Sequence, residues 1–208
     1  GITYQNTNVD QPTAGNRVFT LTQVKDSGGV ANSGVDTTTL SVASTVAVAT
    51  VNDAPTLTAT AANPTFTEGL GAGVQGAAVS VFSGAAASTV ETGQTITGLT
   101  FTVSGLVDGA NETIVVDGKT ITLGATGSGT TTTNGLSYTA TVSGGTATVV
   151  LSGGTLNATA TQALVNGITY QNTNVDQPTA GNRVFTLTQV KDSGGVANSG
   201  VDTTTLSV

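Results

Sequence analysis

Cysteine, histidine, methionine and tryptophan are all absent from the 208 residues of the sequence. The lack of cysteine excludes disulfides, and the lack of both cysteine and histidine excludes a Ser-His-Asp triad, a thiol nucleophile and an ordinary zinc site. The three glutamates, Glu68, Glu91 and Glu112, could in principle supply a glycosidase carboxylate pair, but no aromatic platform accompanies them. We therefore expect no enzymatic activity.

Charge is also scarce, because charged residues make up 8% of the chain, where about 25% is usual. The formal net charge of −7 disfavours nucleic acid and anionic membrane surfaces as partners. No apolar run approaches the roughly 18 residues of a membrane span, so we expect no membrane insertion. Hydrophobic residues nevertheless reach 37%, which is more than a disordered chain would carry and indicates a folded protein.

One long segment occurs twice, because residues 167–208 repeat residues 1–42 letter for letter at an offset of 166 residues. Such a period exceeds the roughly 20–50 residues of a solenoid repeat and suits a whole domain of about 100–200 residues. We expect a string of separately folded modules in which copy number sets length. Residues 1–51 would be the C-terminal part of an upstream module, and residues 52–208 a nearly complete second module.

Turn chemistry fixes the register of two strand pairs. Asp117-Gly118 supplies the positive φ angles of a two-residue turn and sets Ile114 opposite Ile121. A Gly-Gly turn at residues 144–145 pairs the strands on either side of it and places their apolar side chains on one face. That face contains Tyr138, Ala140, Val142, Ala147, Val149 and Leu151, paired as Val142–Ala147, Ala140–Val149 and Tyr138–Leu151.

Further strands are expected where threonine and apolar residues alternate, at residues 17–24, 37–51, 99–103 and 183–190. Many short strands joined by glycine-rich turns predict an all-β protein. The expected architecture is an antiparallel β-sandwich, immunoglobulin- or cadherin-like, repeated in tandem.

One short helix is expected at residues 157–166. Its apolar face is predicted from the spacing of Ala160, Ala163 and Leu164. The three tyrosines, Tyr4, Tyr138 and Tyr170, fall in expected strands and are predicted to be core residues.

Three motifs follow one another in the repeat: the linker Val-Asn-Asp-Ala-Pro-Thr at residues 51–56, where Pro55 interrupts strand pairing, then Asn-Pro-Thr-Phe-Thr-Glu-Gly, then the segment from Gly-Ile-Thr-Tyr-Gln-Asn-Thr to Lys-Asp-Ser-Gly-Gly. In this order and spacing they resemble the cadherin-like repeats of giant bacterial surface adhesins, which are RTX-type proteins exported by type I secretion. The resemblance implies an extracellular location at the bacterial cell surface and a role in adhesion or biofilm formation. It also implies neighbouring modules of the same chain as partners, calcium at the module junctions, and no catalysis.

The resemblance further indicates which residues would bind calcium. Asp53 lies in the linker, Asp192 lies in a loop that resembles the cadherin Asp-x-Gly ligand, and Glu68 resembles the early-strand glutamate of the family. Glu91 stands where cadherins carry an Asp-x-Asp pair, and this departure leaves fewer charges for the ion. Calcium takes about 6–8 oxygen ligands and could stiffen a junction that would otherwise swivel. We expect the metal ligands to be Asp53, Glu68, Glu91 and Asp192.

Three functions remain open at this point. The first is a structural extender that spaces or projects the binding tip of an adhesin. The second is a carbohydrate-binding module, although a sugar site would normally show an exposed tryptophan or tyrosine. The third is a protomer of a self-assembling extracellular fibre or surface layer, because an array of identical modules is also suited to homopolymer assembly.

Overall fold

The computed structural model describes all 208 residues, and they form two compact units, Gly1–Val51 and Asn52–Val208. The division falls at the linker that the sequence predicts. We call Gly1–Val51 the N-terminal hairpin and Asn52–Val208 the module, and describe each by itself.

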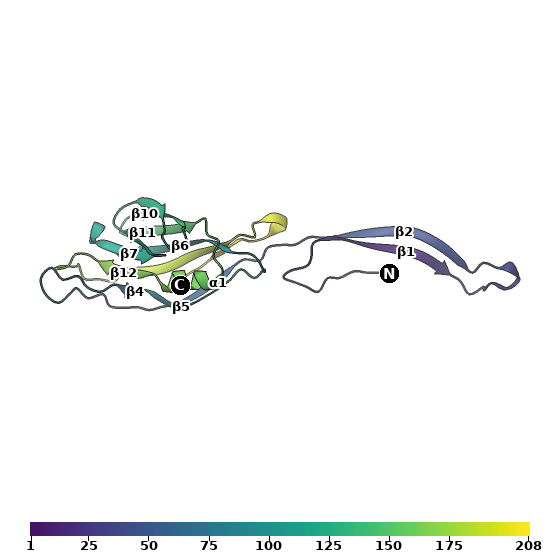
Figure 1. Ribbon diagram of the computed structural model, residues 1–208, viewed down its shortest axis with the longest axis horizontal. Helices are drawn as coiled ribbons and strands as arrows, with labels where there is room; N and C mark the ends of the chain where they lie inside the picture. The colour runs from purple at the N-terminus through teal and green to yellow at the C-terminus, as the bar shows by residue number, and fades with distance from the viewer. The chain divides into compact units, whose positions relative to one another are not determined.

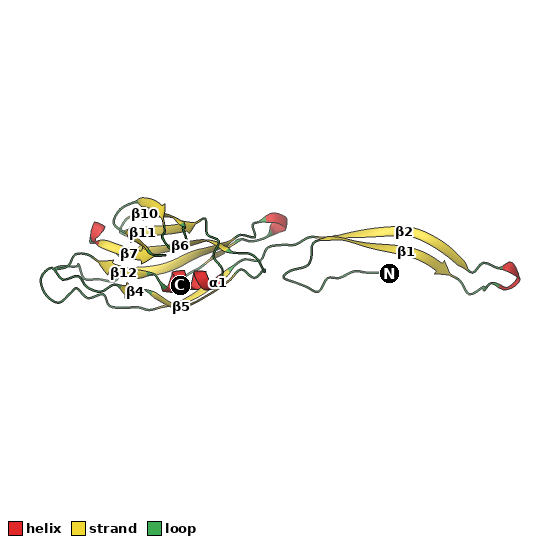
Figure 2. Ribbon diagram, viewed as in Figure 1, coloured by secondary structure: helices red, strands yellow, loops and turns green.

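The N-terminal hairpin consists of two long antiparallel strands, β1 (Gly15–Lys25) and β2 (Thr37–Val48). The pairing runs from Lys25 opposite Thr37 to Gly15 opposite Val48, with one irregularity near Leu21. The turn between the strands contains one 3₁₀ segment, Ala31–Ser33. Figure 2 shows the two strands as a ribbon with no second sheet packed on them within this unit.

The regular elements of the module are almost all strands, as expected (Figure 1). Its elements are β3 (Thr56–Ala61), β4 (Val79–Ser80), β5 (Phe82–Ser88), β6 (Ile96–Ser104), β7 (Glu112–Val116), β8 (Lys119–Thr122), β9 (Gly127–Thr130), β10 (Ser137–Ser143), β11 (Thr146–Ser152), α1 (Ala158–Asn166), β12 (Thr169–Asn172), β13 (Val184–Asp192) and β14 (Thr203–Thr205). Two further 3₁₀ segments lie at Gly109–Asn111 and Ala197–Ser199.

The strands of the module form three antiparallel sheets. The largest has the order β14-β13-β6-β11-β10-β9, the second has the order β4-β12-β7-β8, and β3 pairs with β5. Buried side chains from all three sheets and from α1 form one hydrophobic core. The module is therefore an all-β, sandwich-like fold, which confirms the fold class predicted from the sequence.

Both predicted hairpin registers are confirmed. Ile114 lies opposite Ile121 across a turn in which Asp117 and Gly118 have φ angles of 50° and 76°. The Gly-Gly turn joins β10 and β11 with the expected partners, Val142–Ala147, Ala140–Val149 and Tyr138–Leu151. Four of these six side chains are buried, while Tyr138 and Val142 are half-buried against the core.

The helix is present, and of its predicted apolar face Leu164 is buried and Ala160 packs against the core, but the placement of Ala163 is wrong. α1 begins after Asn157, whose side chain accepts a hydrogen bond from the Ala160 N–H. The buried side chains are Thr161, Leu164 and Val165, and Ala163 faces solvent. The helix packs with a threonine inward because the Thr161 hydroxyl bonds the carbonyl of Asn157, which satisfies its polar atom locally.

The two copies of the repeated segment have different surroundings. In the module, Ile168, Leu187 and Val190 are each 0% exposed. Their counterparts in the N-terminal hairpin, Ile2, Leu21 and Val24, are 80%, 49% and 55% exposed. No residue of the N-terminal hairpin is buried. The sequence is the same, so the difference comes from the strands that cover it in the module.

The same difference in surroundings determines which of the three tyrosines are buried. Tyr170 is buried in β12 and Tyr138 is half-buried, as predicted for core residues. Tyr4, the counterpart of Tyr170, is 38% exposed and lies outside any strand, so its assignment to the core was wrong. The reason is that Tyr4 lacks the partners β4 and β7 that hold β12 in the module.

Candidate functional site

The first residue of the module is held by its last long loop. The Asn52 side chain donates from Nδ2 to the Val201 carbonyl at 2.7 Å and to the Asp192 carboxylate at 3.2 and 3.4 Å, and its Oδ1 accepts from Gln94 Nε2 at 2.6 Å. Its backbone carbonyl accepts from the Val201 N–H at 2.9 Å. Asn52 and Asp192 are both buried. We call Asn52, Gln94, Asp192 and Val201 the Asn52 clamp.

Two glycines make room for this residue. A Cβ atom at Gly194 would lie 1.7 Å from Asn52 Oδ1 and 2.5 Å from Gln94 Nε2. A Cβ atom at Gly200 would lie 2.9 Å from the Asn52 backbone nitrogen. Real Cβ atoms do not approach other atoms this closely, so the loop needs glycine at these positions in order to close over Asn52. The Asp-Ser-Gly-Gly loop therefore serves to hold the linker.

Glu91 and Asp53 meet beside this clamp. Glu91 Oε1 accepts from the Asp53 backbone N–H at 2.7 Å. Glu91 Oε2 is buried and has no hydrogen-bond partner, and the same is true of Gln94 Oε1. Buried oxygen atoms normally accept at least one hydrogen bond. A cation bound beside Glu91 Oε2 and Gln94 Oε1 would supply the partner that each of these oxygens lacks.

Of the four predicted metal ligands, three gather at this end of the module and one does not. Asp53 is part of the linker, Glu91 accepts from the Asp53 N–H, and Asp192 accepts from Asn52 Nδ2. Glu68 lies elsewhere, near the other end of the module. Its backbone is close to Gly76, and the Gly76 carbonyl accepts a hydrogen bond from the Gln171 side chain. No group of three or more acidic side chains is placed so that it could hold a metal ion.

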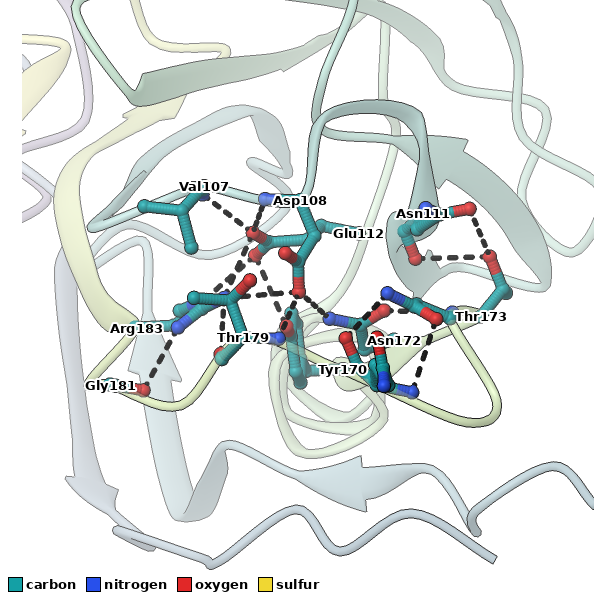
Figure 3. Close-up of polar contacts among 12 residues, drawn as sticks. Val107, Asp108, Asn111, Glu112, Tyr170, Asn172, Thr173, Thr179, Gly181 and Arg183 are labelled. Carbon is teal, nitrogen blue, oxygen red and sulfur yellow. Dashed lines mark hydrogen bonds and ion pairs between the residues drawn. The ribbon is translucent and has the colours of Figure 1, made fainter. Parts of the chain in front are cut away.

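A second polar cluster lies at the opposite end of β13, around Glu112 (Figure 3). The Glu112 carboxylate is 0% exposed and accepts five hydrogen bonds. They come from the backbone N–H groups of Val107 and Asp108 at 2.8 Å each, the Tyr170 hydroxyl at 3.1 Å, and Nε and Nη2 of Arg183 at 3.0 and 3.1 Å. This bidentate pairing supplies the compensation that a buried charge needs.

Asp108 extends this network. Its Oδ2 accepts from Asn172 Nδ2 at 2.5 Å and from the Thr179 N–H at 2.8 Å, and lies 3.6 Å from Arg183 Nη2. Figure 3 shows the carboxylates of Asp108, just before the 3₁₀ segment, and Glu112, the first residue of β7, close to Arg183. We call Asp108, Glu112, Tyr170, Asn172 and Arg183 the Glu112 network.

The network shifts the acidity of its members. Burial alone would raise the pKa of Glu112, but the hydrogen bonds from Arg183 and from the N–H groups of Asp108 and Val107 outweigh it and lower that pKa. Burial also acts to raise the pKa of Asp108, and hydrogen bonds from Thr179 and Asn172 with the charge of Arg183 lower it on balance. Burial and the nearby Glu112 charge raise the pKa of Tyr170 to about 12.

Sequence reasoning missed this network. Nothing in the sequence analysis connects Asp108, Glu112 and Arg183. Glu112 and Arg183 are separated by 71 residues, so no local pattern joins them. One signal was present: Arg183 is one of only five basic residues in the chain and stands at the head of an expected strand.

The Asp117 turn also does more than the sequence indicates. Asp117 accepts hydrogen bonds from the Thr131 hydroxyl and from both nitrogens of Asn134, and so ties a later loop to the β7–β8 hairpin. This contact positions the loop that leads into β10.

The first and last residues of the module lie at different positions along β13. Entry is at Asn52, clamped beside Asp192 at the end of β13. Val208 pairs with Leu187 at the middle of β13. In the N-terminal hairpin, Val42 is the counterpart of Val208, and β2 continues beyond it to Val48. Val48 lies opposite Gly15, which is the counterpart of Gly181.

Comparisons with known proteins add no relatives. No protein-family model, no curated protein and no solved structure matches the chain. The structure contains no helix that is both long and apolar enough to cross a membrane.

Proposed function

We propose that this chain is a structural extender: a tandem array of β-sandwich modules that spaces or projects the binding tip of a secreted bacterial surface adhesin. Two observations support the proposal: Asn52 lies at the Asp192 end of β13, and in the N-terminal hairpin β2 continues past Val42, the counterpart of Val208, to the Gly15 end. A module that continues in the same way is entered and left at opposite ends of β13. Modules repeated at 166 residues and joined in this way add length in one direction, which is what a spacer requires.

The Asn52 clamp supports the same role. A spacer is useful only if its links do not swivel freely. Here the linker residue Asn52 is buried and bonded by both its side chain and its backbone, and Thr204 donates a hydrogen bond to the Pro55 carbonyl. The linker thus becomes part of the module within one residue of the boundary.

Calcium at the linker remains part of the proposal. The residues that would hold it are Glu91 and Asp53, with the side-chain oxygen of Gln94, because two of these side chains carry the buried oxygens without partners. The ion would neutralise the carboxylates and fix the first residues of the linker. Asp192 is already occupied by Asn52 and by the Gly194 N–H, and Glu68 lies too far along the module to join the set.

The adhesion and biofilm role, the cell-surface location and the absence of catalysis belong to the same proposal. They rest on the motifs that resemble adhesin repeats and on a residue inventory without histidine or cysteine.

Force spectroscopy of an array of three or more 166-residue periods tests the extender role. Each module should unfold as one event that releases roughly 500 Å of chain, because about 157 residues at about 3.3–3.6 Å each become extended. The number of equal events should match the number of modules. Arrays that stretch without discrete unfolding events, or whose unfolding events differ in size, would refute the extender role.

A further inference from the structure

The N-terminal hairpin carries an apolar face and a free strand edge whose occupant can be identified from the chain itself. β1 pairs only with β2, so its other edge is unpaired. In the module the same sequence, β13, uses that edge to pair with β6, in a register that runs from Val184 opposite Ser104 to Asp192 opposite Ile96. Exposed apolar faces with an unpaired edge are sites of association.

We infer that the N-terminal hairpin is competent to dock on the Asn52–Asn166 part of a second copy of this chain in place of that copy's own Gly167–Val208, and that it does so when this resident segment is weakened. The two segments have identical sequences, so every contact that β12, β13 and β14 make in the module is also available to the N-terminal hairpin. This inference does not depend on a role in adhesion.

Arg17 provides a second and independent indication. Its Nη1 and Nη2 bond the carbonyls of Gly15 and Thr13 at 3.1 and 2.7 Å. Arg183 makes the same two bonds to Gly181 and Thr179, and it additionally binds the Glu112 carboxylate. Arg17 thus has the local conformation of a network arginine but no carboxylate partner in the N-terminal hairpin.

The hairpin does not reach the acceptor of its own chain while β2 stays paired. Docked in place of β13, β1 would carry Val48, paired with Gly15, to the Gly181 end. Asn52 is clamped at the Asp192 end, about 33 Å away for ten residues of strand. Asn52 follows Val48 by only four residue steps, which span at most about 14 Å. The acceptor must therefore belong to another copy.

Exchange is suppressed in the native sequence because the resident segment is tethered. Gly167 follows α1 directly, so Gly167–Val208 competes with an effective concentration in roughly the millimolar range. At micromolar concentration we therefore expect the native chain to be monomeric, with a mass of 20.3 kDa. Weakening the resident copy alone removes this advantage and should let the N-terminal hairpin of another chain enter.

The test uses four full-length chains: native, Leu21→Asp, Leu187→Asp, and the variant with both substitutions. Leu187 is fully buried and Leu21 is half-exposed, so the substitutions are chemically identical but differ in surroundings. Light scattering after size exclusion, and urea unfolding at several protein concentrations, are the measurements. We expect Leu187→Asp to remain folded with at least twice the monomer mass, and its unfolding midpoint to rise with concentration.

The other chains are the controls. Leu21→Asp should match the native chain, and the double variant should lose the folded module, because neither copy can then fill the acceptor. A Leu187→Asp chain that unfolds like the double variant, or that shares its mass distribution, overturns the inference. So does a folded Leu187→Asp monomer, since it would mean docking within one chain. The pair Leu187→Ala and Leu21→Ala/Leu187→Ala repeats the comparison with a milder change if the Asp variants are insoluble.

Discussion

Removal of Arg183 is predicted to be one of the most damaging single changes in the module, while the same change at Arg17 is predicted to be nearly silent. Arg183 gives Glu112 two hydrogen bonds and lies 3.6 Å from Asp108. Arg17 bonds only backbone carbonyls. We choose methionine as the replacement, because it keeps most of the side-chain length without the charge.

The expected magnitude follows from what Glu112 retains. Breaking a buried ion pair by removing one partner costs about 3–5 kcal/mol, because the remaining charge is left buried. Glu112 keeps the Val107 and Asp108 N–H groups and the Tyr170 hydroxyl, so we expect the lower end, about 3 kcal/mol. Arg17→Met should change the free energy of unfolding by less than about 0.5 kcal/mol.

Urea unfolding of the 208-residue chain, followed by circular dichroism, measures both effects. Arg183→Met is best measured in the Arg17→Met background, where the N-terminal hairpin of another chain cannot supply a replacement arginine. Equal free energies of unfolding for Arg17→Met and the Arg17→Met/Arg183→Met double variant would refute the role assigned to the Glu112 network.

The pH dependence gives a further check on the same variants. The folded pKa values of Glu112 and Asp108 are lowered, so their stabilising contribution is present above the unfolded pKa of about 4 and is lost as pH falls through the lowered values. Without Arg183, Glu112 loses its largest pKa-lowering contact while its burial remains, so we expect the buried charge to destabilise the module at neutral pH. The deficit of the double variant should therefore be smaller at pH 4 than at pH 7.

Three further predictions follow. Gly194→Ala should destabilise the module by about 1–3 kcal/mol in urea unfolding, because the new Cβ atom collides with Asn52, whereas Gly28→Ala in the N-terminal hairpin should have little effect. In an alkaline absorbance titration, one tyrosine should ionise at a pH of about 12, and Tyr170→Phe should remove that step. Millimolar calcium should raise the melting temperature of a two-module chain, and Asp53→Ala should reduce the shift; an unchanged melting temperature in both would count against calcium at the linker.

The parts of the fold that the sequence predicts are the local ones. The Asp117-Gly118 and Gly-Gly turns specify both register and face, because turn geometry and side-chain alternation over a few residues give the same answer. The helix was also placed correctly, because the spacing of Ala160, Ala163 and Leu164 is again a local signal. Its buried face was predicted only in part: Leu164 and Ala160 pack on the core, but Ala163 does not, and Thr161 is buried instead because it can bond its hydroxyl within its own helix.

The long-range parts were beyond such reasoning. The Glu112 network joins residues that lie up to 75 positions apart, Asp108 and Arg183, and the Asn52 clamp joins Asn52 to Asp192 over 140 positions. Three predicted ligands share one end of the module because the linker, a loop and a strand end meet there. Glu68 does not, since the long connection between β3 and β4 carries it toward the other end. The exposure of Tyr4 shows the same limit, because burial depends on strands supplied from elsewhere.

The length of arrays that contain different numbers of modules tests the extender account most directly. β1 alone spans about 36 Å for its eleven residues, so with loops and linker each added 166-residue period should lengthen the particle by about 40–50 Å. Electron microscopy or small-angle X-ray scattering of arrays with one to four periods gives this increment. The account predicts a straight line of maximum dimension against repeat number. A dimension that levels off as modules are added would contradict it.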